Sequence, residues 1–276
     1  MKLFISADFE GVRGIVDRSQ CFPGSPDFER ARRLWVEEIN CIVATALEAG
    51  ATEVLVNEAH AAMNYLPAEL LHPRASWISG YVKQDNQMEG LDESYTGAIL
   101  MGHAMAGTAS GVLNHTYVMR DVVEIRLGGQ PIGELGLNAY WAAYLGVPVI
   151  LVVGDEASVQ EIRKLNPQVE TAVLKYGISQ FCARNLPADT AGEILRSSTK
   201  RAVERIGEIT PLAVPDSLIM EIDFSLSEIA HLCSFVPGVE QLSGRTIRFS
   251  ARDYRELQHI RIVCTNLTLA VVRAHF

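Results

Sequence analysis

The chain has 276 residues, of which 48% are hydrophobic and 21% are charged, so it can bury a sizeable core and has the composition of an ordinary globular protein. Its 33 acidic residues outnumber its 24 Lys and Arg residues, which gives a formal net charge of -9. This balance argues against nucleic acid or an anionic membrane surface as a partner, because both attract basic proteins.

The cysteine pattern predicts a reducing compartment. The cysteines are odd in number and widely spaced, and none belongs to a C-x-x-C pair, so neither a disulfide framework nor a thiolate zinc site is favoured. Acidic residues at positions 8 and 10 interrupt any signal-peptide core. We therefore expect a cytoplasmic protein with reduced thiols. The cysteines are Cys21, Cys41, Cys182, Cys233 and Cys264.

Apolar strands alternate with amphipathic helices along most of the chain. The pattern predicts a first strand at residues 2–7, a helix whose apolar stripe ends before Gly50, and a second strand at residues 53–57. The uncharged run 135–154 has the length of a membrane span, but its glycines and Pro148 divide it into a helix and a strand. Further strands are predicted at residues 76–79, 98–101, 123–127, 149–153 and 170–175, and further helices at residues 135–145, 156–165 and 187–207.

This alternation predicts an α/β fold with a mostly parallel sheet flanked by helices. In the last quarter of the chain the pattern changes, because residues 218–224 and 245–250 alternate like half-exposed strands and residues 253–273 form a long helix. We therefore predict an α/β core over residues 1–209. A smaller C-terminal α+β lobe over residues 210–276 would pack on the core or at subunit contacts.

Titratable side chains follow three of the predicted strands and open one helix. Asp8 and Glu10 come directly after the first strand, and residues two apart in an extended chain point to the same side. His60 follows the second strand, His103 follows the fourth, and Glu134 opens a helix. In a parallel α/β sheet the carboxyl ends of the strands are the usual ligand site, so these residues are candidates for one site.

The residue types in this set favour a metal. Carboxylate oxygens combined with neutral imidazoles are the ligands expected for catalytic zinc or a similar divalent ion. Two carboxylates and two histidines can hold one ion, and a third carboxylate allows two ions that share a bridging Asp. Each residue has a purely structural alternative: Asp8 and Glu10 as capping acids, His60 and His103 as core histidines, and Glu134 as an acid that complements the helix dipole.

His115 lies in a loop that follows His103 after a short span rich in glycine and other small residues. Such a loop can bend close to a substrate. His115 is therefore a candidate third metal ligand, general acid or base, or oxyanion donor. An ordinary surface histidine is the alternative.

Seven segments in chain order form a specific combination of motifs. They are KLFISADFEG (2–11), VLVNEAH (54–60), LHPRASWISG (71–80), MEGLDESYTGAILMGHA (88–104), GVLNHT (111–116), GELGLNAYWAAYLGVPVILVVGDE (133–156) and AVLKYGIS (172–179). Together they resemble the zinc-dependent D-aminopeptidase family associated with bacterial dipeptide-transport operons. The likeness covers most of the chain and is strongest in its first two thirds.

The resemblance implies an aminopeptidase with two zinc ions per subunit, in which Asp8 is the bridging ligand and His115 has a catalytic role. Members of the family release an N-terminal D-amino acid such as D-Ala from short peptides. They assemble as ring-shaped homo-oligomers, with a decamer as one candidate size. The zinc ligands that the resemblance implies are Asp8, Glu10, His60, His103 and Glu134.

The expected reaction is attack of a metal-activated water on the scissile carbonyl, with His115 stabilising the oxyanion or protonating the leaving amine. One alternative is a dinuclear metal amidohydrolase acting on a non-peptide amide, because the same ligands would activate water for it. A phosphoesterase would need more basic side chains than Arg13 and Arg120 near these motifs. A non-enzymatic metal-holding protein is the last alternative, and hydrolysis assays with chelation and zinc restoration test it.

Overall fold

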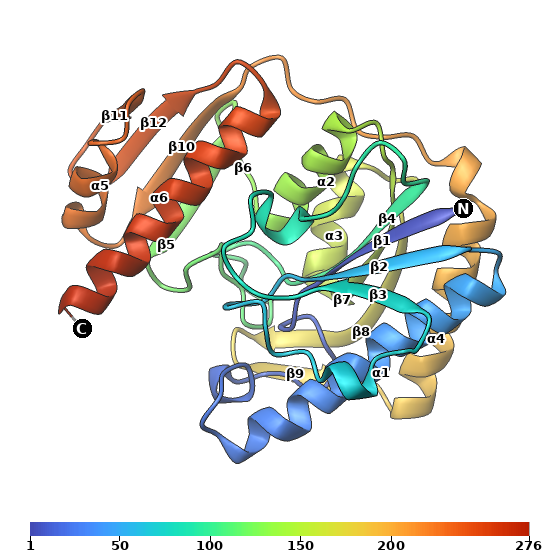
Figure 1. Ribbon diagram of the computed structural model, residues 1–276. Helices are drawn as coiled ribbons and strands as arrows, with labels where there is room; N and C mark the ends of the chain where they lie inside the picture. Colours follow the sequence, from blue (N-terminus) through green and yellow to red (C-terminus); the bar gives the residue numbers. More distant parts are fainter. Residues whose placement is uncertain (276) are drawn as a thin grey trace.

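The computed structural model describes residues 1–275 and contains two sheets with helices packed on them (Figure 1). The larger sheet has the strand order β3-β2-β1-β4-β7-β8-β9. Neighbouring strands in it are parallel, except that β9 runs antiparallel to β8. Its strands are β1 (Lys2–Ala7), β2 (Glu53–Glu58), β3 (Ala75–Ile78), β4 (Gly97–Met101), β7 (Val149–Asp155), β8 (Glu170–Ser179) and β9 (Cys182–Asn185).

Helices cover both faces of the larger sheet. Leu3 and Ile5 of β1 pack into one core with α1 and α4, whereas Phe4 points to a second core that contains α2 and α3. Because both faces are buried, strands such as β1 and β7 are nearly continuous apolar runs. The predicted α/β fold with a mostly parallel sheet is confirmed. These helices are α1 (Pro26–Glu48), α2 (Glu134–Tyr144), α3 (Glu156–Leu165) and α4 (Ala188–Glu204).

The smaller sheet is antiparallel, with the strand order β11-β12-β10-β5-β6. Alternate side chains of β10 are buried, among them Ile222 and Phe224, in a core shared with α5 and α6. The elements of this lobe are β5 (Val122–Leu127), β6 (Gln130–Pro131), β10 (Ile219–Phe224), β11 (Val239–Gln241), β12 (Thr246–Ser250), α5 (Ser227–Cys233) and α6 (Tyr254–His275).

The smaller sheet draws on both predicted units. β5 and β6 belong to the predicted core of residues 1–209, yet β5 pairs with β10 of the predicted lobe, residues 210–276. Charged side chains support this pairing, since Arg126 of β5 donates to Glu221 and Asp223 of β10 at 3.0 and 2.7 Å. The division after residue 209 stays a prediction about folding units, while the sheet itself crosses that position.

Several short elements were not predicted. The strands β9 and β11 have four and three residues, which is too short for an alternating pattern to be recognised. Helix α5, with seven residues, spans only two turns. Four 3-10 turns were missed for the same reason, namely η1 (Arg18–Gln20), η2 (Ala68–Leu70), η3 (Asn86–Met88) and η4 (Ile206–Glu208).

The uncharged run 135–154 is divided between α2 and β7, as predicted. Within residues 1–275 we find no helix with the length and apolar character needed to span a membrane. All five cysteines are free thiols.

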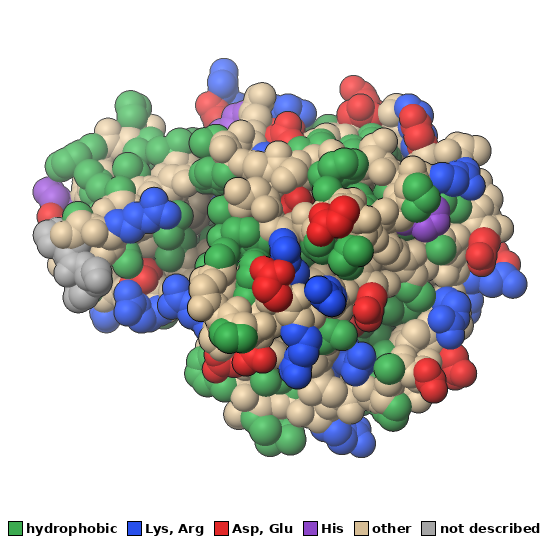
Figure 2. Space-filling view, turned by 60° about the horizontal axis from the view of Figure 1, so that its bottom comes forward, with side chains coloured by type: hydrophobic (Ala, Val, Ile, Leu, Met, Phe, Trp, Pro, Cys, Tyr) green, Lys and Arg blue, Asp and Glu red, His purple; other side chains and the backbone are tan. Residues whose placement is uncertain are grey.

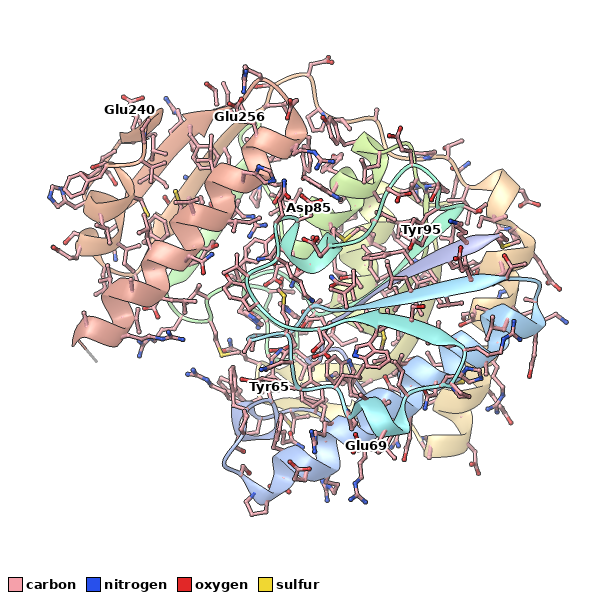
Figure 3. All side chains as sticks on the ribbon, in the orientation of Figure 1. Tyr65, Glu69, Asp85, Tyr95, Glu240 and Glu256 are labelled. Atoms are coloured by element: carbon pink, nitrogen blue, oxygen red, sulfur yellow. The ribbon has the colours of Figure 1, made fainter. Side chains whose placement is uncertain are left out.

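Helix α6 docks the smaller lobe on the main body. Asp85, labelled in Figure 3, lies between the two, 3.7 Å from Arg255 and 3.5 Å from His259 of α6. The hydroxyl of Tyr254 donates to the backbone carbonyl of Leu137 in α2 at 2.8 Å. These contacts place α6 beside η3 and α2, and therefore beside the carboxyl edge of the larger sheet.

Candidate metal centre

Three neighbouring strands bring the predicted ligands to one edge of the larger sheet. β1 lies between β2 and β4, and all three are parallel, so the residues that follow them meet at the carboxyl edge. Asp8 and Glu10 follow β1, His60 follows β2, and His103 follows β4. Glu134 is the first residue of α2. All five residues are buried, with 2–6% of their surface exposed.

Asp8 contacts two imidazoles. Its Oδ1 lies 3.4 Å from Nδ1 of His60, and its Oδ2 lies 3.3 Å from Nε2 of His103. Oε2 of Glu10 lies 3.0 Å from the same Nδ1 of His60, and Oε1 of Glu134 lies 3.5 Å from Nε2 of His103. Asp8 thus joins two half-sites, which is the position that the family resemblance implies for a bridging ligand.

Donor atoms of two triplets lie close enough to hold metal ions. The ligand atoms of Asp8, Glu10 and His103 lie within 4.8 Å of one another. The same holds for His103, His115 and Glu134. The structure therefore brings all the predicted site residues together, including the loop histidine.

Each of the three imidazoles has one nitrogen fixed by a backbone carbonyl. Nε2 of His60 lies 2.9 Å from the carbonyl oxygen of Cys21, and Nδ1 of His103 lies 3.0 Å from that of the next residue. Nδ1 of His115 lies 2.8 Å from the carbonyl oxygen of Leu113. A carbonyl only accepts, so these nitrogens carry the protons and the opposite nitrogens face the carboxylates. Metal-binding histidines are oriented in this way.

The buried carboxylates attract positive charge. Burial, the largest single effect, lowers the pKa of His103, but the Asp8 carboxylate 3.3 Å away and the charge of Glu134 raise it to about 10. The pKa of His60 is likewise raised well above its usual value against the effect of burial, chiefly by the charge of Glu10. Burial raises the pKa of Asp8, but its contacts with the two imidazoles bring it below its usual range. Protons on the imidazoles or a divalent cation can supply this positive charge.

The donors fit zinc. Nε2 of His103 is buried and has no hydrogen-bond partner among the described residues, although Asp8 and Glu134 lie within 3.5 Å of it. A buried nitrogen facing carboxylates without a hydrogen bond is unfavourable unless a cation lies between them. Carboxylate oxygens with imidazole nitrogens, and no thiolate, form the usual donor set of catalytic zinc.

Two donors orient Glu134. The side-chain amide of Gln87 donates to its Oε2, and the backbone N–H of Tyr117 donates to its Oε1. Asn138 in turn donates to Oε1 of Gln87 at 2.7 Å and fixes the direction of that amide. Tyr117 has a φ of 58°, in the left-handed region that is rare for residues other than glycine and that recurs at functional sites.

Lys175 of β8 holds the loop that carries Glu10. Its Nζ donates to the backbone carbonyls of Glu10, Val12 and Ile15, all within 2.9 Å, and the side chain is fully buried. Three carbonyl acceptors match the three N–H groups of an ammonium ion. Burial lowers the pKa of Lys175 to about 8, which leaves the ammonium form predominant at pH 7.

Gly11 allows the loops after β1 and β4 to touch. A Cβ atom at this position would lie 2.1 Å from the backbone oxygen of Gly102, the residue before His103. No other residue type permits this approach without displacing one of the loops. The distance between Asp8 and His103 therefore depends on a glycine at position 11.

His115 completes the cluster from a loop. Its ring stacks on that of His103 with the centroids 4.0 Å apart, and its Nε2 lies 3.8 Å from Oε1 of Glu134. Burial and the positive charge of His103 lower the pKa of His115, so its imidazole is neutral at pH 7. The loop is fixed by the β8–β9 hairpin, because the N–H of Leu113 donates to the carbonyl of Gln180 at 2.7 Å.

All residues of the cluster except His103 line a cavity of about 440 Å³. Tyr65, labelled in Figure 3, and Phe22 form part of its wall beside the ligands. Another part of the wall comes from α6 through Thr265, Asn266 and Leu269. The smaller lobe therefore shapes the space in which a substrate would bind.

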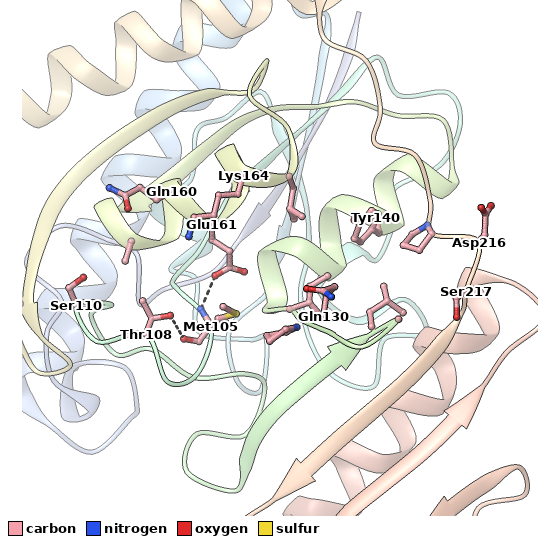
Figure 4. Close-up of a pocket in the computed structure, with 17 residues that line it drawn as sticks. Met105, Thr108, Ser110, Gln130, Tyr140, Gln160, Glu161, Lys164, Asp216 and Ser217 are labelled. Carbon is pink, nitrogen blue, oxygen red and sulfur yellow. Dashed lines mark hydrogen bonds between the residues drawn. The ribbon is translucent and has the colours of Figure 1, made fainter.

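A second cavity, of about 610 Å³, contains none of the predicted ligands (Figure 4). Tyr140 and Lys164 contribute to its wall, and Glu161 accepts a hydrogen bond from the N–H of Met105 at 2.9 Å. Burial raises the pKa of Glu161. This cavity is larger than the first, but it lacks the convergent donors of a catalytic site.

The residues that support the ligands were not among the predicted site residues. Lys175 could have been found, because a lysine within the apolar run of β8 suggests a buried charge with dedicated partners. Gln87 lies in a three-residue turn and shows no periodicity or motif. Tyr117 acts through its backbone N–H, so its side-chain type carries no information about that contact.

An α/β sheet that presents carboxylates and histidines in a buried cluster beside a cavity defines a metal-dependent hydrolase. The family model of the M55 peptidases, described as D-aminopeptidase, matches residues 1–262, and the chain belongs to this family.

Two further comparisons agree with this assignment. A D-aminopeptidase of Bacillus subtilis (strain 168) is 37% identical over 270 residues, which cover 98% of each chain. The solved structure of the Zn-dependent D-aminopeptidase DppA from Bacillus subtilis, described as a self-compartmentalizing protease, has a TM-score of 0.94 and 38% identity over 98% of each chain. The predicted family is confirmed, whereas the individual roles of the site residues stay predictions.

Proposed function

We propose that this protein is a zinc-dependent aminopeptidase that removes the N-terminal residue, a D-amino acid such as D-Ala, from short peptides. The observation that carries the proposal is the buried cluster in which Asp8 directs one oxygen at His60 and the other at His103. Family membership and the two matches to D-aminopeptidases of Bacillus subtilis, one of them described as Zn-dependent, support the metal and the D-configuration.

Two zinc ions per subunit would be held by the buried cluster, with Asp8 shared between them. Bound zinc supplies Lewis-acid polarisation of a carbonyl and lowers the pKa of a coordinated water. The carboxylates of the cluster attract the α-ammonium group of a peptide, which places the first peptide bond beside the metals. The proposed zinc ligands are Asp8, Glu10, His60, His103 and Glu134.

His115 moves a proton in this proposal. Its Nδ1 donates to the carbonyl of Leu113, so Nε2 is the unprotonated nitrogen and faces the cluster. Nε2 can therefore accept a proton from the attacking water and transfer it to the leaving amine. This tautomer favours general acid–base catalysis over the role of a neutral oxyanion donor.

We also propose that the protein is cytoplasmic and assembles as a ring-shaped homo-oligomer, with a decamer as one candidate size. The proposed assembly is supported by the description of DppA as self-compartmentalizing. Large hydrophobic side chains reach the surface, among them Val82, Ile178 and Phe235 with 67–80% of their area exposed. Figure 2 shows hydrophobic surface between interspersed acidic and basic side chains on one face. Light scattering coupled to size exclusion measures the subunit number, and a monomer would contradict this assembly.

The activity is tested with purified protein before chelation, after chelation and after addition of ZnCl₂. We expect about two zinc ions per subunit and cleavage of D-Ala-D-Ala that chelation abolishes and zinc restores. L-Ala-L-Ala tests the stereochemical preference. A zinc-loaded protein that cleaves a non-peptide amide but no dipeptide would replace the proposal with the amidohydrolase alternative. A zinc-loaded protein that cleaves none of these compounds would contradict both the aminopeptidase proposal and the amidohydrolase alternative.

A further inference from the structure

The cavity at the metal centre is lined by charges of opposite sign. Asp8, Glu10 and Glu134 belong to the buried cluster, whereas the three arginines that line the same cavity are exposed to solvent. The inner end of the cavity is therefore acidic and its outer part is basic. A short peptide carries an ammonium group at one end and a carboxylate at the other, so its charges match this arrangement. The three arginines are Arg18, Arg120 and Arg273.

The separation between Arg18 and the metal centre has an upper limit. Its guanidinium carbon is 5.1 Å from the centroid of the Phe22 ring, and that centroid is 5.4 Å from the centroid of His60. These two distances limit the separation between the Arg18 guanidinium and the His60 ring to about 10 Å. Residue Arg18 begins η1, a turn whose start is fixed by a capping box between Asp17 and Gln20.

The Arg18 guanidinium is available for an anion. Within the described part of the chain its side chain contacts the Phe22 ring and forms no ion pair with a carboxylate. Arg120 differs, because its Nη2 lies 3.3 Å from Oδ2 of Asp121, which offsets part of its charge. Stacking on Phe22 also restricts the guanidinium, so less conformational entropy is lost when it binds a carboxylate.

We propose that Arg18 binds the C-terminal carboxylate of the substrate and so selects dipeptides with a free C-terminus. This inference rests on the proposed aminopeptidase function, which places the substrate ammonium group at the acidic end. Two extended residues span about 7 Å, and a guanidinium–carboxylate hydrogen bond adds about 3 Å. The carboxylate of a dipeptide anchored near His60 therefore reaches Arg18. Each further residue moves the carboxylate of an extended peptide by about 3.5 Å, so the carboxylate of a longer peptide passes beyond Arg18.

The test compares D-Ala-D-Ala with its C-terminal amide, using the zinc-loaded enzyme. Wild-type enzyme is expected to prefer the free acid by about tenfold in kcat/KM. Arg18→Met should lower kcat/KM for the acid by about tenfold through KM, because this contact is equal in the ground state and the transition state. The same variant should leave the amide unchanged. Arg18→Lys keeps the charge without the bidentate geometry and should recover part of the effect.

A control variant and a longer substrate test whether the effect is specific to Arg18 and to dipeptides. Arg74→Met removes an exposed arginine that does not line the cavity, and it should behave as wild type on both substrates. The preference for acid over amide should shrink for the tripeptide D-Ala-Gly-Gly. An unchanged acid preference in Arg18→Met, or an equal loss on acid and amide, would overturn the inference while the aminopeptidase function stands. A wild-type enzyme that cleaves neither dipeptide would instead remove the proposed function on which the inference rests.

Discussion

Oδ2 of Asp8 lies 3.3 Å from Nε2 of His103, and that nitrogen has no hydrogen-bond partner among the described residues. The other ring nitrogen of His103 donates to a backbone carbonyl, so in the neutral, metal-binding form of the imidazole the lone pair of Nε2 faces the carboxylate. Two lone pairs facing each other in a buried site repel, whereas a cation between them is held by both. Because Oδ1 of Asp8 faces His60 in the same way, one carboxylate serves both halves of the cluster.

Asp8→Asn is expected to remove both metal ions. The amide cannot replace a carboxylate shared between two cations, so zinc content should fall from about two ions per subunit to well below one. Glu134→Gln should remove about one ion, because Glu134 contacts only the His103 half of the site. Metal analysis of the purified variants measures this, with the exposed acid variant Asp92→Asn as the control. Full zinc occupancy in Asp8→Asn would contradict the bridging role.

His115→Ala is expected to lower kcat by roughly two to four orders of magnitude while zinc content is unchanged. The reason is that Nε2 of His115 faces Glu134 at 3.8 Å and is the proton acceptor of the proposed reaction. Kinetics and metal analysis on the same preparation separate the possible roles. Since His115 also belongs to a potential metal-binding triplet, a loss of one zinc ion would make it a ligand instead.

The sequence was sufficient to predict where the site lies. Strands that end at one edge of a parallel sheet place Asp8, His60 and His103 together whatever the details of the loops, and this is the arrangement found. It was not sufficient to predict the residues that orient these ligands. Gln87 reaches Glu134 from a loop, and such contacts between distant segments leave no local pattern.

In the fold, too, features with a local sequence pattern were predicted, whereas pairing between distant segments was not. The elements of the larger sheet follow from local hydrophobic patterns, because both of its faces are buried. The pairing of β5 with β10 joins segments about a hundred residues apart, so no local pattern shows that residues 122–127 belong to the smaller sheet. The predicted lobe boundary therefore followed a change in the local pattern along the chain, whereas the sheet is formed by tertiary pairing across that boundary.

Lys175→Met is expected to weaken both the fold and the metal site. Loss of the ammonium group leaves three buried carbonyls in the Glu10 loop without their donor, which should lower the free energy of unfolding by about 3 kcal/mol. Zinc affinity should fall because the same loop positions Glu10. Urea denaturation and zinc titration measure the two effects. Lys200→Met, which removes an exposed lysine on α4, is the control. Wild-type zinc affinity in Lys175→Met would show that the loop keeps its shape without this contact.

Glu38 makes stability depend on pH. It is buried in α1, its Oε1 accepts the N–H of Arg13 at 3.0 Å, and its Oε2 has no partner among the described residues. Burial raises its pKa to about 8 from the usual 4.5, only partly offset by the Arg13 N–H and by Lys175. The native protein therefore keeps this proton between pH 4.5 and 8, where the unfolded chain loses it. Stability must fall as pH rises through this range.

Glu38→Gln should abolish this contribution, because the amide is neutral at every pH. The free energy of unfolding of the wild type relative to Glu38→Gln should decrease by about 3 to 5 kcal/mol between pH 4.5 and 8. Urea denaturation of both proteins at several pH values gives this difference, and zinc-dependent effects common to both cancel in it. Glu37→Gln, at the exposed neighbouring position, should run parallel to wild type. If the curve of Glu38→Gln also ran parallel to wild type, Glu38 would have to be ionised in the native protein at pH 7, with Lys175 or a bound water as its partner.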